Sequence, residues 1–184
     1  MRHAPTAATR AAAFPRDEPL DSRARAQAAE LATVVTAAGE ALSSPARRCR
    51  ETAAAAGLDP APDEHLAECD FGSWAGRSLA DVQESEPEGV GAWMSDPDAS
   101  PHGGESLAAF ARRIGAWLDS QARADGRAVA ITHGGVVKAA LVHAVAAPLA
   151  AFWRFDAAPL AVTELHAHDG RWTVTRVNCA GPPA

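Results

Sequence analysis

The sequence lacks any hydrophobic run long enough to cross a membrane. No window approaches the roughly 18 consecutive apolar residues that a span requires. The most apolar stretch, residues 136–153, is interrupted by Lys138, His143 and Pro148. Residues 1–20 mix arginines and acidic residues without an apolar centre, so they predict no signal peptide. We therefore expect a cytoplasmic protein that makes no membrane contacts.

Cysteine pairs, a basic surface and metal-binding motifs are also missing. Cys49, Cys69 and Cys179 form no Cys-x-x-Cys pair and are odd in number, which favours free thiols in a reducing compartment. The net charge of -6 argues against nucleic acid as a partner, because duplex binding needs a basic surface. A few arginines in a cleft can still bind a small anion. No histidine, cysteine or aspartate spacing is typical of a metal site, so we expect no metal and no cofactor.

The sequence does contain alternating short strands and helices. A length of 184 residues with 47% hydrophobic residues suits one domain, residues 1–184, with a sizeable core. Strands are predicted at 40–43 and 127–132, and a terminal hairpin at 161–166 and 172–177. Helices are predicted at 21–38, 45–56, 106–124 and 134–145, with two short ones within 77–95. Residues 4–20, 57–76 and 96–104 are expected to be irregular. The alternation predicts an α/β fold with a mainly parallel sheet covered on both faces.

Two histidines are the first candidates for a functional site. His133 follows an apolar run and precedes two glycines and a helical pattern, which places it at the carboxyl end of a strand, where α/β sheets bind ligands. His3 stands beside Arg2. A neutral imidazole is a good nucleophile toward phosphorus, and a guanidinium can hold phosphoryl oxygens in a bidentate grip. Taken alone, residues 1–3 of a chain are more often a disordered terminus.

An arginine-rich segment, residues 43–53, is the second candidate. Arginine at a strand-to-helix junction can combine with the positive end of the helix to bind an anion. Arg47, Arg48 and Arg50 point in different directions on a helix, so at most two of them can face one cleft. A solvated basic helix face explains the same residues equally well.

Two turn-rich segments complete the set. Glu68 lies among apolar residues and turns, where partial burial would raise its pKa and let it donate a proton to a leaving group. Asp70 is a competing carboxylate. Residues 100–106 form either a glycine turn that leads into a helix cap or a segment that lies over the cleft and contacts substrate. Within them, His102 is expected to be exposed.

In this order along the chain, the motifs resemble those of the histidine phosphatase superfamily, also called phosphoglycerate mutase-like. Arg2-His3-Ala4-Pro5-Thr6 resembles the family's first histidine motif, and Thr132-His133-Gly134-Gly135 its second. The Ser-Ser-Pro segment assigns the second arginine role to Arg48, and a Leu-x-Glu-x-x-Phe-Gly segment matches at Glu68. Within the family, the motifs look like those of the small phosphatases grouped with α-ribazole phosphatase.

The resemblance implies a three-layer α/β/α sandwich with its pocket at the carboxyl ends of the strands. It implies metal-independent hydrolysis of a small phosphorylated metabolite through a phosphohistidine intermediate. In that reaction His3 attacks phosphorus, and Glu68 protonates the leaving alcohol. The phosphoryl oxygens would be bound by Arg2, Arg48 and His133, and the rest of the substrate by Thr9 and Glu105.

Other functions are open at this point. A mutase would return the phosphoryl group to its substrate, a phospholigand-binding protein would form no phosphohistidine, and an unrelated metal enzyme would lose activity with a chelator. The sequence also departs from the family pattern, because Ala4 and Pro5 replace a Gly-Glu pair and only Met1 precedes Arg2. The family has a strand there, so the first strand is expected to be truncated, with neighbouring backbone groups exposed and His3 loosened. Either the start lies upstream, or the fold tolerates a stub.

Overall fold

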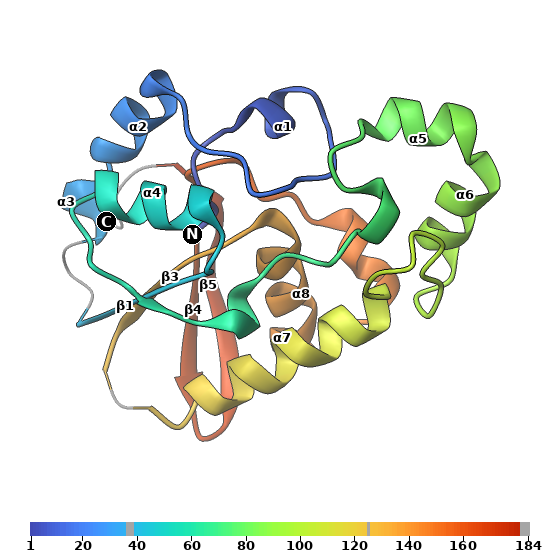
Figure 1. The fold of residues 1–184 in the computed structure, drawn as a ribbon. Coiled ribbons are helices and arrows are strands. Elements are labelled where there is room, and N and C mark those ends of the chain that lie inside the picture. The colour runs from blue at the N-terminus through green and yellow to red at the C-terminus, as the bar shows by residue number, and fades with distance from the viewer. Residues whose placement is uncertain (36–38, 125, 181–184) are drawn as a thin grey trace.

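The computed structural model describes residues 1–35, 39–124 and 126–180 and has an α/β fold with a parallel central sheet (Figure 1). The sheet has the strand order β2-β1-β3. Its strands are β1 (Glu40–Ser43), β2 (Ala61–Pro62) and β3 (Ala128–Ile131). Ser43 pairs with Ile131, so β1 and β3 end at the same level of the sheet. A separate antiparallel hairpin consists of β4 (Val162–His168) and β5 (Arg171–Cys179).

Helices flank the sheet. The α-helices are α1 (Ala7–Arg10), α2 (Ser22–Ala29), α3 (Ala32–Val35), α4 (Arg47–Ala55), α5 (Leu79–Ser85), α6 (Pro87–Ser95), α7 (Leu107–Gln121) and α8 (Gly134–Ala144). The 3-10 helices of the described residues are η1 (Glu64–Leu66), η2 (Gly72–Trp74) and η3 (Leu149–Arg154). Within the described ranges, no helix has both the length and the apolar character that crossing a membrane requires.

Two hydrophobic cores form on opposite faces of the sheet because successive strand side chains point to opposite sides. Leu42 packs with α7 and α8, in a cluster that includes Phe110 and Ile114. Ile131 packs instead against α4, with Cys49 and Ala53. The sheet is therefore the middle of three layers, as the sequence predicts.

The first residues of the chain lie along β3. The Met1 amino group donates to the Ala130 carbonyl oxygen over 2.7 Å, and the His3 N–H donates to the Thr132 carbonyl oxygen over 2.8 Å. On the other side, the Arg2 N–H donates to the Ala161 carbonyl oxygen. The prediction that a short first strand loosens His3 is wrong, because backbone hydrogen bonds hold this segment on both sides and His3 is only 5% exposed.

Most predicted elements are found, with corrections at the irregular segments. The helix predicted at 21–38 is divided into α2 and α3, and its expected end lies outside the described residues. Asp21 caps α2 by accepting the Ala24 N–H. The segment 4–20 contains α1, which begins with a capping box between Thr6 and Thr9. The segment 57–76 contains β2, η1 and η2. The terminal hairpin is confirmed.

Candidate active site

His3 is held as a neutral imidazole with one free nitrogen. Its Nδ1 lies 2.7 Å from the carbonyl oxygen of Ala4. A carbonyl oxygen can only accept, so Nδ1 carries the hydrogen and Nε2 keeps its lone pair. Burial, with the nearby Arg48 guanidinium as the next cause, lowers the pKa of His3 to about 3. The ring is therefore uncharged at neutral pH, as a nucleophile must be.

His133 lies beside His3 at the start of α8. The two ring centroids are 5.3 Å apart with an interplanar angle of 68°. Arg48 Nη2 lies 3.1 Å from His133 Nδ1, and His133 Nε2 lies 2.8 Å from Ser44 Oγ. Because a guanidinium only donates, Nδ1 accepts and Nε2 carries the hydrogen. Burial and the charge of Arg48 hold the pKa of His133 well below its usual range.

Two arginines bring unpaired donors to these rings. Arg48 is 3% exposed, and it donates from Nη1 to the Arg16 carbonyl oxygen. Arg2 donates from Nη1 to the Ala157 carbonyl oxygen. Within the described residues, the Nε groups of Arg2 and Arg48 are buried without an acceptor. Leaving such a donor unpaired costs about 1–3 kcal/mol, more for a charged group, so the pair indicates a site for an anion.

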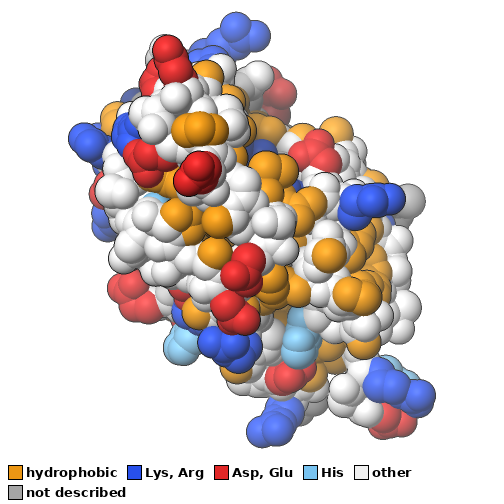
Figure 2. Space-filling model, turned by 90° about the vertical axis from the view of Figure 1, so that its right-hand side faces the viewer, with side chains coloured by type: hydrophobic (Ala, Val, Ile, Leu, Met, Phe, Trp, Pro, Cys, Tyr) orange, Lys and Arg blue, Asp and Glu red, His pale blue; other side chains and the backbone are white. Residues whose placement is uncertain are grey.

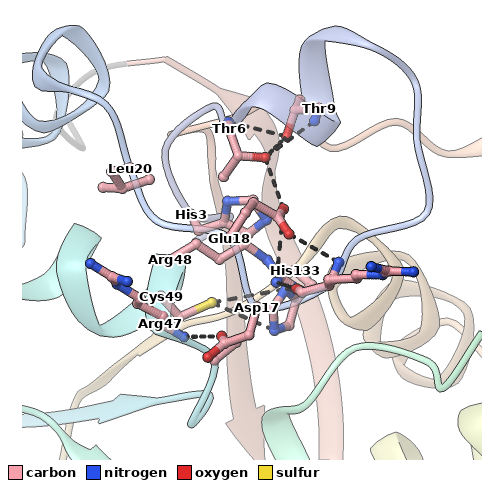
Figure 3. A network of polar contacts seen from close by, with 12 residues as sticks. His3, Thr6, Thr9, Asp17, Glu18, Leu20, Arg47, Arg48, Cys49 and His133 are labelled. Atoms are coloured by element: carbon pink, nitrogen blue, oxygen red, sulfur yellow. Dashed lines mark hydrogen bonds and ion pairs between the residues drawn. The ribbon is translucent and has the colours of Figure 1, made fainter. Parts of the chain in front are cut away.

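Glu18 fixes the loop that precedes α2 to this cluster (Figure 3). Its Oε1 accepts the Thr6 hydroxyl over 3.0 Å and lies 4.0 Å from Arg48 Nη1. Its Oε2 accepts the Arg16 N–H over 2.9 Å. The Arg48 side chain is thus held by His133, by the Arg16 carbonyl group and by a carboxylate, which sets its orientation before any ligand binds.

Glu68 lies against the start of α8. Its carboxylate accepts the N–H groups of Cys69 (3.1 Å) and Gly135 (3.2 Å). A Cβ atom at Gly135 would lie 2.2 Å from Glu68 Oε1, so only glycine allows this close approach. Burial raises the pKa of Glu68, and the two backbone donors oppose that effect. The carboxyl group is therefore prepared to hold a proton at higher pH than an exposed glutamate.

A pocket of about 230 Å³ opens beside this cluster, with Arg2 and Glu68 in its wall. Five aromatic side chains line it, namely Phe71, Trp93, Phe110, Phe152 and Trp153. Lys138 and Asp156 are its other charged residues. The side of the molecule that carries α5 and α6 is turned toward the viewer in Figure 2, where hydrophobic side chains gather in a band. Arg2 and Glu68 of this cluster thus border a cavity with an aromatic wall.

The family-model comparison agrees with this geometry. Residues 1–180 match the model described as histidine phosphatase superfamily (branch 1).

The chain belongs to the histidine phosphatase superfamily.

Relatives and solved structures extend the finding. The bifunctional protein Rv2228c of Mycobacterium tuberculosis is 32% identical over 148 residues, which cover 76% of this chain and 40% of that protein. The chain thus spans well under half of the curated relatives that it matches. A mycobacterial glucosyl-3-phosphoglycerate phosphatase in complex with VO3 aligns with a TM-score of 0.86 and 26% identity, covering 97% of this chain and 96% of that one. The α-ribazole phosphatase of Shigella flexneri aligns with a TM-score of 0.86 and 22% identity, covering 100% and 96%.

The two predicted substrate contacts of this histidine phosphatase lie outside the pocket wall. Thr9 Oγ1 is 3.2 Å from Thr6 Oγ1 in the cap of α1, and Glu105 forms an ion pair with Arg113 at 2.7 Å. Among the described residues that line the pocket, neither is included. Their role in binding substrate stays a prediction.

His102 corrects another expectation, because it is 2% exposed rather than on the surface. Its ring packs 5.0 Å from that of Trp74, and its Nδ1 accepts the Gly104 N–H. A Cβ atom at Gly72 would lie 2.1 Å from the His102 carbonyl oxygen. Glycines therefore let two loops fold onto each other and cover the ring, a long-range contact that local sequence does not reveal.

Sequence reasoning missed two kinds of residue in the site. Ser44 and Glu18 orient His133 and Arg48, although Ser44 stands inside the motif that identified Arg48. The aromatic lining and Lys138 were also missed as functional residues. The sequence signal that could have identified Lys138 is its position in the helix that follows His133.

Proposed function

We propose that this histidine phosphatase hydrolyses a phosphomonoester through a phosphohistidine formed at His3. The observation that carries the proposal is the hydrogen bond from His3 Nδ1 to Ala4, which leaves a neutral Nε2 lone pair. That nitrogen belongs to the same buried cluster as two arginines whose Nε donors lack acceptors. A nucleophile and an anion site in one place favour phosphoryl transfer over passive binding.

The first step transfers the phosphoryl group to His3. Nε2 forms a bond to phosphorus while the bond from phosphorus to the alcohol oxygen breaks, and Glu68 gives its proton to that oxygen. Arg2 and Arg48 hold the phosphoryl oxygens through their free Nε groups. His133 donates from Nε2, in exchange for its bond to Ser44. Phosphoryl transfer depends mainly on such positioning and charge stabilisation.

The second step regenerates the enzyme. A water molecule attacks phosphorus as the bond to His3 Nε2 breaks, and the Glu68 carboxylate takes the proton from that water. Inorganic phosphate then leaves, and both residues return to their starting protonation states. The reaction needs no group beyond those of the chain and water.

The relatives support phosphatase chemistry without naming the substrate. Proteins of this fold act on different phosphomonoesters, since one solved neighbour is an α-ribazole phosphatase and another a glucosyl-3-phosphoglycerate phosphatase. A small phosphorylated metabolite as substrate, and a cytoplasmic location away from nucleic acid and membranes, stay predictions of the sequence. The activity of a longer protein containing this domain is likewise a proposal.

The test is to trap the intermediate. The protein is mixed with 4-nitrophenyl phosphate in EDTA, quenched in alkali and digested, and the peptide that contains residue 3 is examined for an added phosphoryl group by mass spectrometry. We expect turnover with EDTA present and an alkali-stable, acid-labile modification of His3. Turnover without a phosphorylated His3 would contradict the assignment of His3 as the nucleophile. Transfer of phosphate from 3-phosphoglycerate to its 2-position in preference to water would favour the mutase alternative.

A further inference from the structure

Lys138 is the sole lysine of the chain, whose other basic side chains, histidines aside, are all arginines. It lies on α8, the helix that begins directly after His133. Its side chain lines the same pocket as Arg2 and Glu68. The sole ammonium side chain of the sequence therefore lies next to the proposed reacting groups, on the side where the alcohol part of a substrate would lie.

The ammonium group of Lys138 rests on aromatic rings. Its Nζ lies 4.9 Å from the ring centroid of Phe152 and 5.8 Å from that of Trp153. Burial lowers the pKa of Lys138, while the charges of Asp156 and Glu68 act in the opposite direction. Throughout the described ranges, no ion pair or hydrogen bond holds this ammonium group.

The other charged groups of the pocket have protein partners. Arg2 donates to the Ala157 carbonyl oxygen, and its free Nε belongs to the phosphate site. Glu68 accepts the N–H groups of Cys69 and Gly135. Asp156 accepts the Ala157 N–H over 2.8 Å. Lys138 thus differs from its charged neighbours because, among the described residues, its ammonium group contacts aromatic rings and has no hydrogen-bond or ion-pair partner.

We propose that Lys138 is a specificity-determining residue that binds a second anionic group, a carboxylate or a phosphate, on the alcohol part of the substrate. This inference rests on the proposed phosphatase function and narrows its substrate class. The aromatic rings exclude water from one side of the ammonium group, which strengthens a charge-assisted hydrogen bond to an anion. A bond of that kind raises kcat/KM by roughly tenfold to a hundredfold. The effect appears mainly in KM, because the group does not change charge during the reaction.

Three matched substrates test the inference. Phenyl phosphate carries no second anion, 3-carboxyphenyl phosphate carries a carboxylate, and 1,3-phenylene bisphosphate carries a second phosphate. We expect the wild-type protein to prefer at least one charged substrate to phenyl phosphate by roughly tenfold or more in kcat/KM. Which of the two is preferred identifies the anion.

Substitutions of opposite sign sharpen the test. Lys138→Met keeps a side chain of similar length on Phe152 and Trp153. It should bring the ratio of kcat/KM between the charged substrates and phenyl phosphate to about one, whereas Lys138→Arg should retain part of the preference. Asp156→Asn removes a competing negative charge, keeps an acceptor for the Ala157 N–H, and should increase the preference. Arg154→Met, at an exposed cation of η3, is the matched control and should keep the wild-type preference.

A binding measurement separates this inference from the proposed function. Reductive methylation of Lys138, the sole lysine, is followed by mass spectrometry in the His3→Ala variant, which binds without turnover. We expect 3-carboxyphenyl phosphate or the bisphosphate to slow methylation by roughly tenfold, and phenyl phosphate to slow it little at the same occupancy. If the charged compounds protect Lys138 selectively but the wild-type protein does not hydrolyse them, the proposed phosphatase activity would be wrong and the anion-binding role of Lys138 would stand. Turnover with equal preference in wild type and Lys138→Met, and equal protection, would overturn the subsite alone.

Discussion

The proposed phosphate end of this site, formed by the two histidines and two arginines, and the proposed leaving-group end, formed by the aromatic pocket wall, are built from different kinds of contact. At the phosphate end, each functional side chain is fixed by a hydrogen bond to backbone or to another polar side chain, as His3 is by Ala4 and Arg48 by Arg16. At the leaving-group end, aromatic rings from separate segments pack edge to face, as Trp93 and Trp153 do at 4.8 Å. The first arrangement fixes the positions of individual polar atoms, and the second provides an apolar surface. Substitutions at the two ends should therefore differ in size and in the kinetic constant that they change.

The largest effect should come from the nucleophile. His3→Ala removes the nitrogen that bonds phosphorus, so kcat should fall by roughly 10⁴-fold or more. Stopped assays with 4-nitrophenyl phosphate measure the loss, and circular dichroism checks the fold. His168→Ala, at a fully solvated histidine of the hairpin, is the control. If His3→Ala kept a kcat within tenfold of wild type, His3 would not be the nucleophile.

Arg48 should give the next largest effect. Arg48→Met removes a donor to the phosphoryl group and the guanidinium that holds His133, so kcat/KM should fall by roughly a hundredfold to a thousandfold. Arg50→Met, on the exposed side of the same helix, is the matched control and should stay within about twofold of wild type. Equal losses in the two variants would show that general positive charge, rather than a placed guanidinium, binds phosphate.

The pH dependence separates the two titrating groups of the phosphate end. His3 must be neutral, and its folded pKa of about 3 predicts no loss of kcat/KM between pH 7 and pH 4. Glu68 must be protonated in the first step, so kcat/KM should fall as pH rises through its raised pKa. Glu68→Gln should abolish that alkaline limb and reduce kcat on the order of a hundredfold for an alkyl phosphate, and less for 4-nitrophenyl phosphate. A limb that persists in this variant would belong to another group.

The smallest effect should come from the aromatic wall. Trp153→Ala removes ring contacts with Trp93 and Phe152 without touching the phosphate cluster. We expect KM for an aryl phosphate to rise roughly fivefold, since burial of an aromatic group is weakened, with a smaller change in kcat. Steady-state kinetics and a thermal melt measure both consequences. If Trp153→Ala reduced kcat as much as Arg48→Met does, the aromatic wall would contribute to the chemical step and the two ends would not act separately.

The sequence predicted the phosphate end because its residues stand at element boundaries. His133 follows the strand that the apolar run predicts, and Arg48 follows the start of α4, so their positions depend on local signals. Their joint order along the chain then identified the family, which the model match over residues 1–180 confirms. The roles of these residues in catalysis stay predictions.

The leaving-group end was not predictable from local pattern. Trp93 and Trp153 lie in α6 and in the 3-10 helix η3, and their contact depends on how distant segments pack. The exposure of His102 was mispredicted for the same reason, because its burial depends on packing against Phe71 and Trp74 of another loop. The break between α2 and α3 was not predicted either, and Leu31 at this break is buried in the core with Cys49 and Ala53 of α4.

The arrangement at Gly135 makes α8 a common support for both halves of the reaction. The helix follows His133, and the Gly135 N–H in its first turn donates to the Glu68 carboxylate. A small tilt of α8 would therefore move the His133 ring and the Glu68 carboxyl group together, so the distance between the proposed phosphoryl-binding donor and the proposed proton source would be preserved. A side chain at residue 135 would displace the Glu68 carboxylate, because its Cβ atom would lie 2.2 Å from Glu68 Oε1, so this coupling depends on a glycine at the start of the helix.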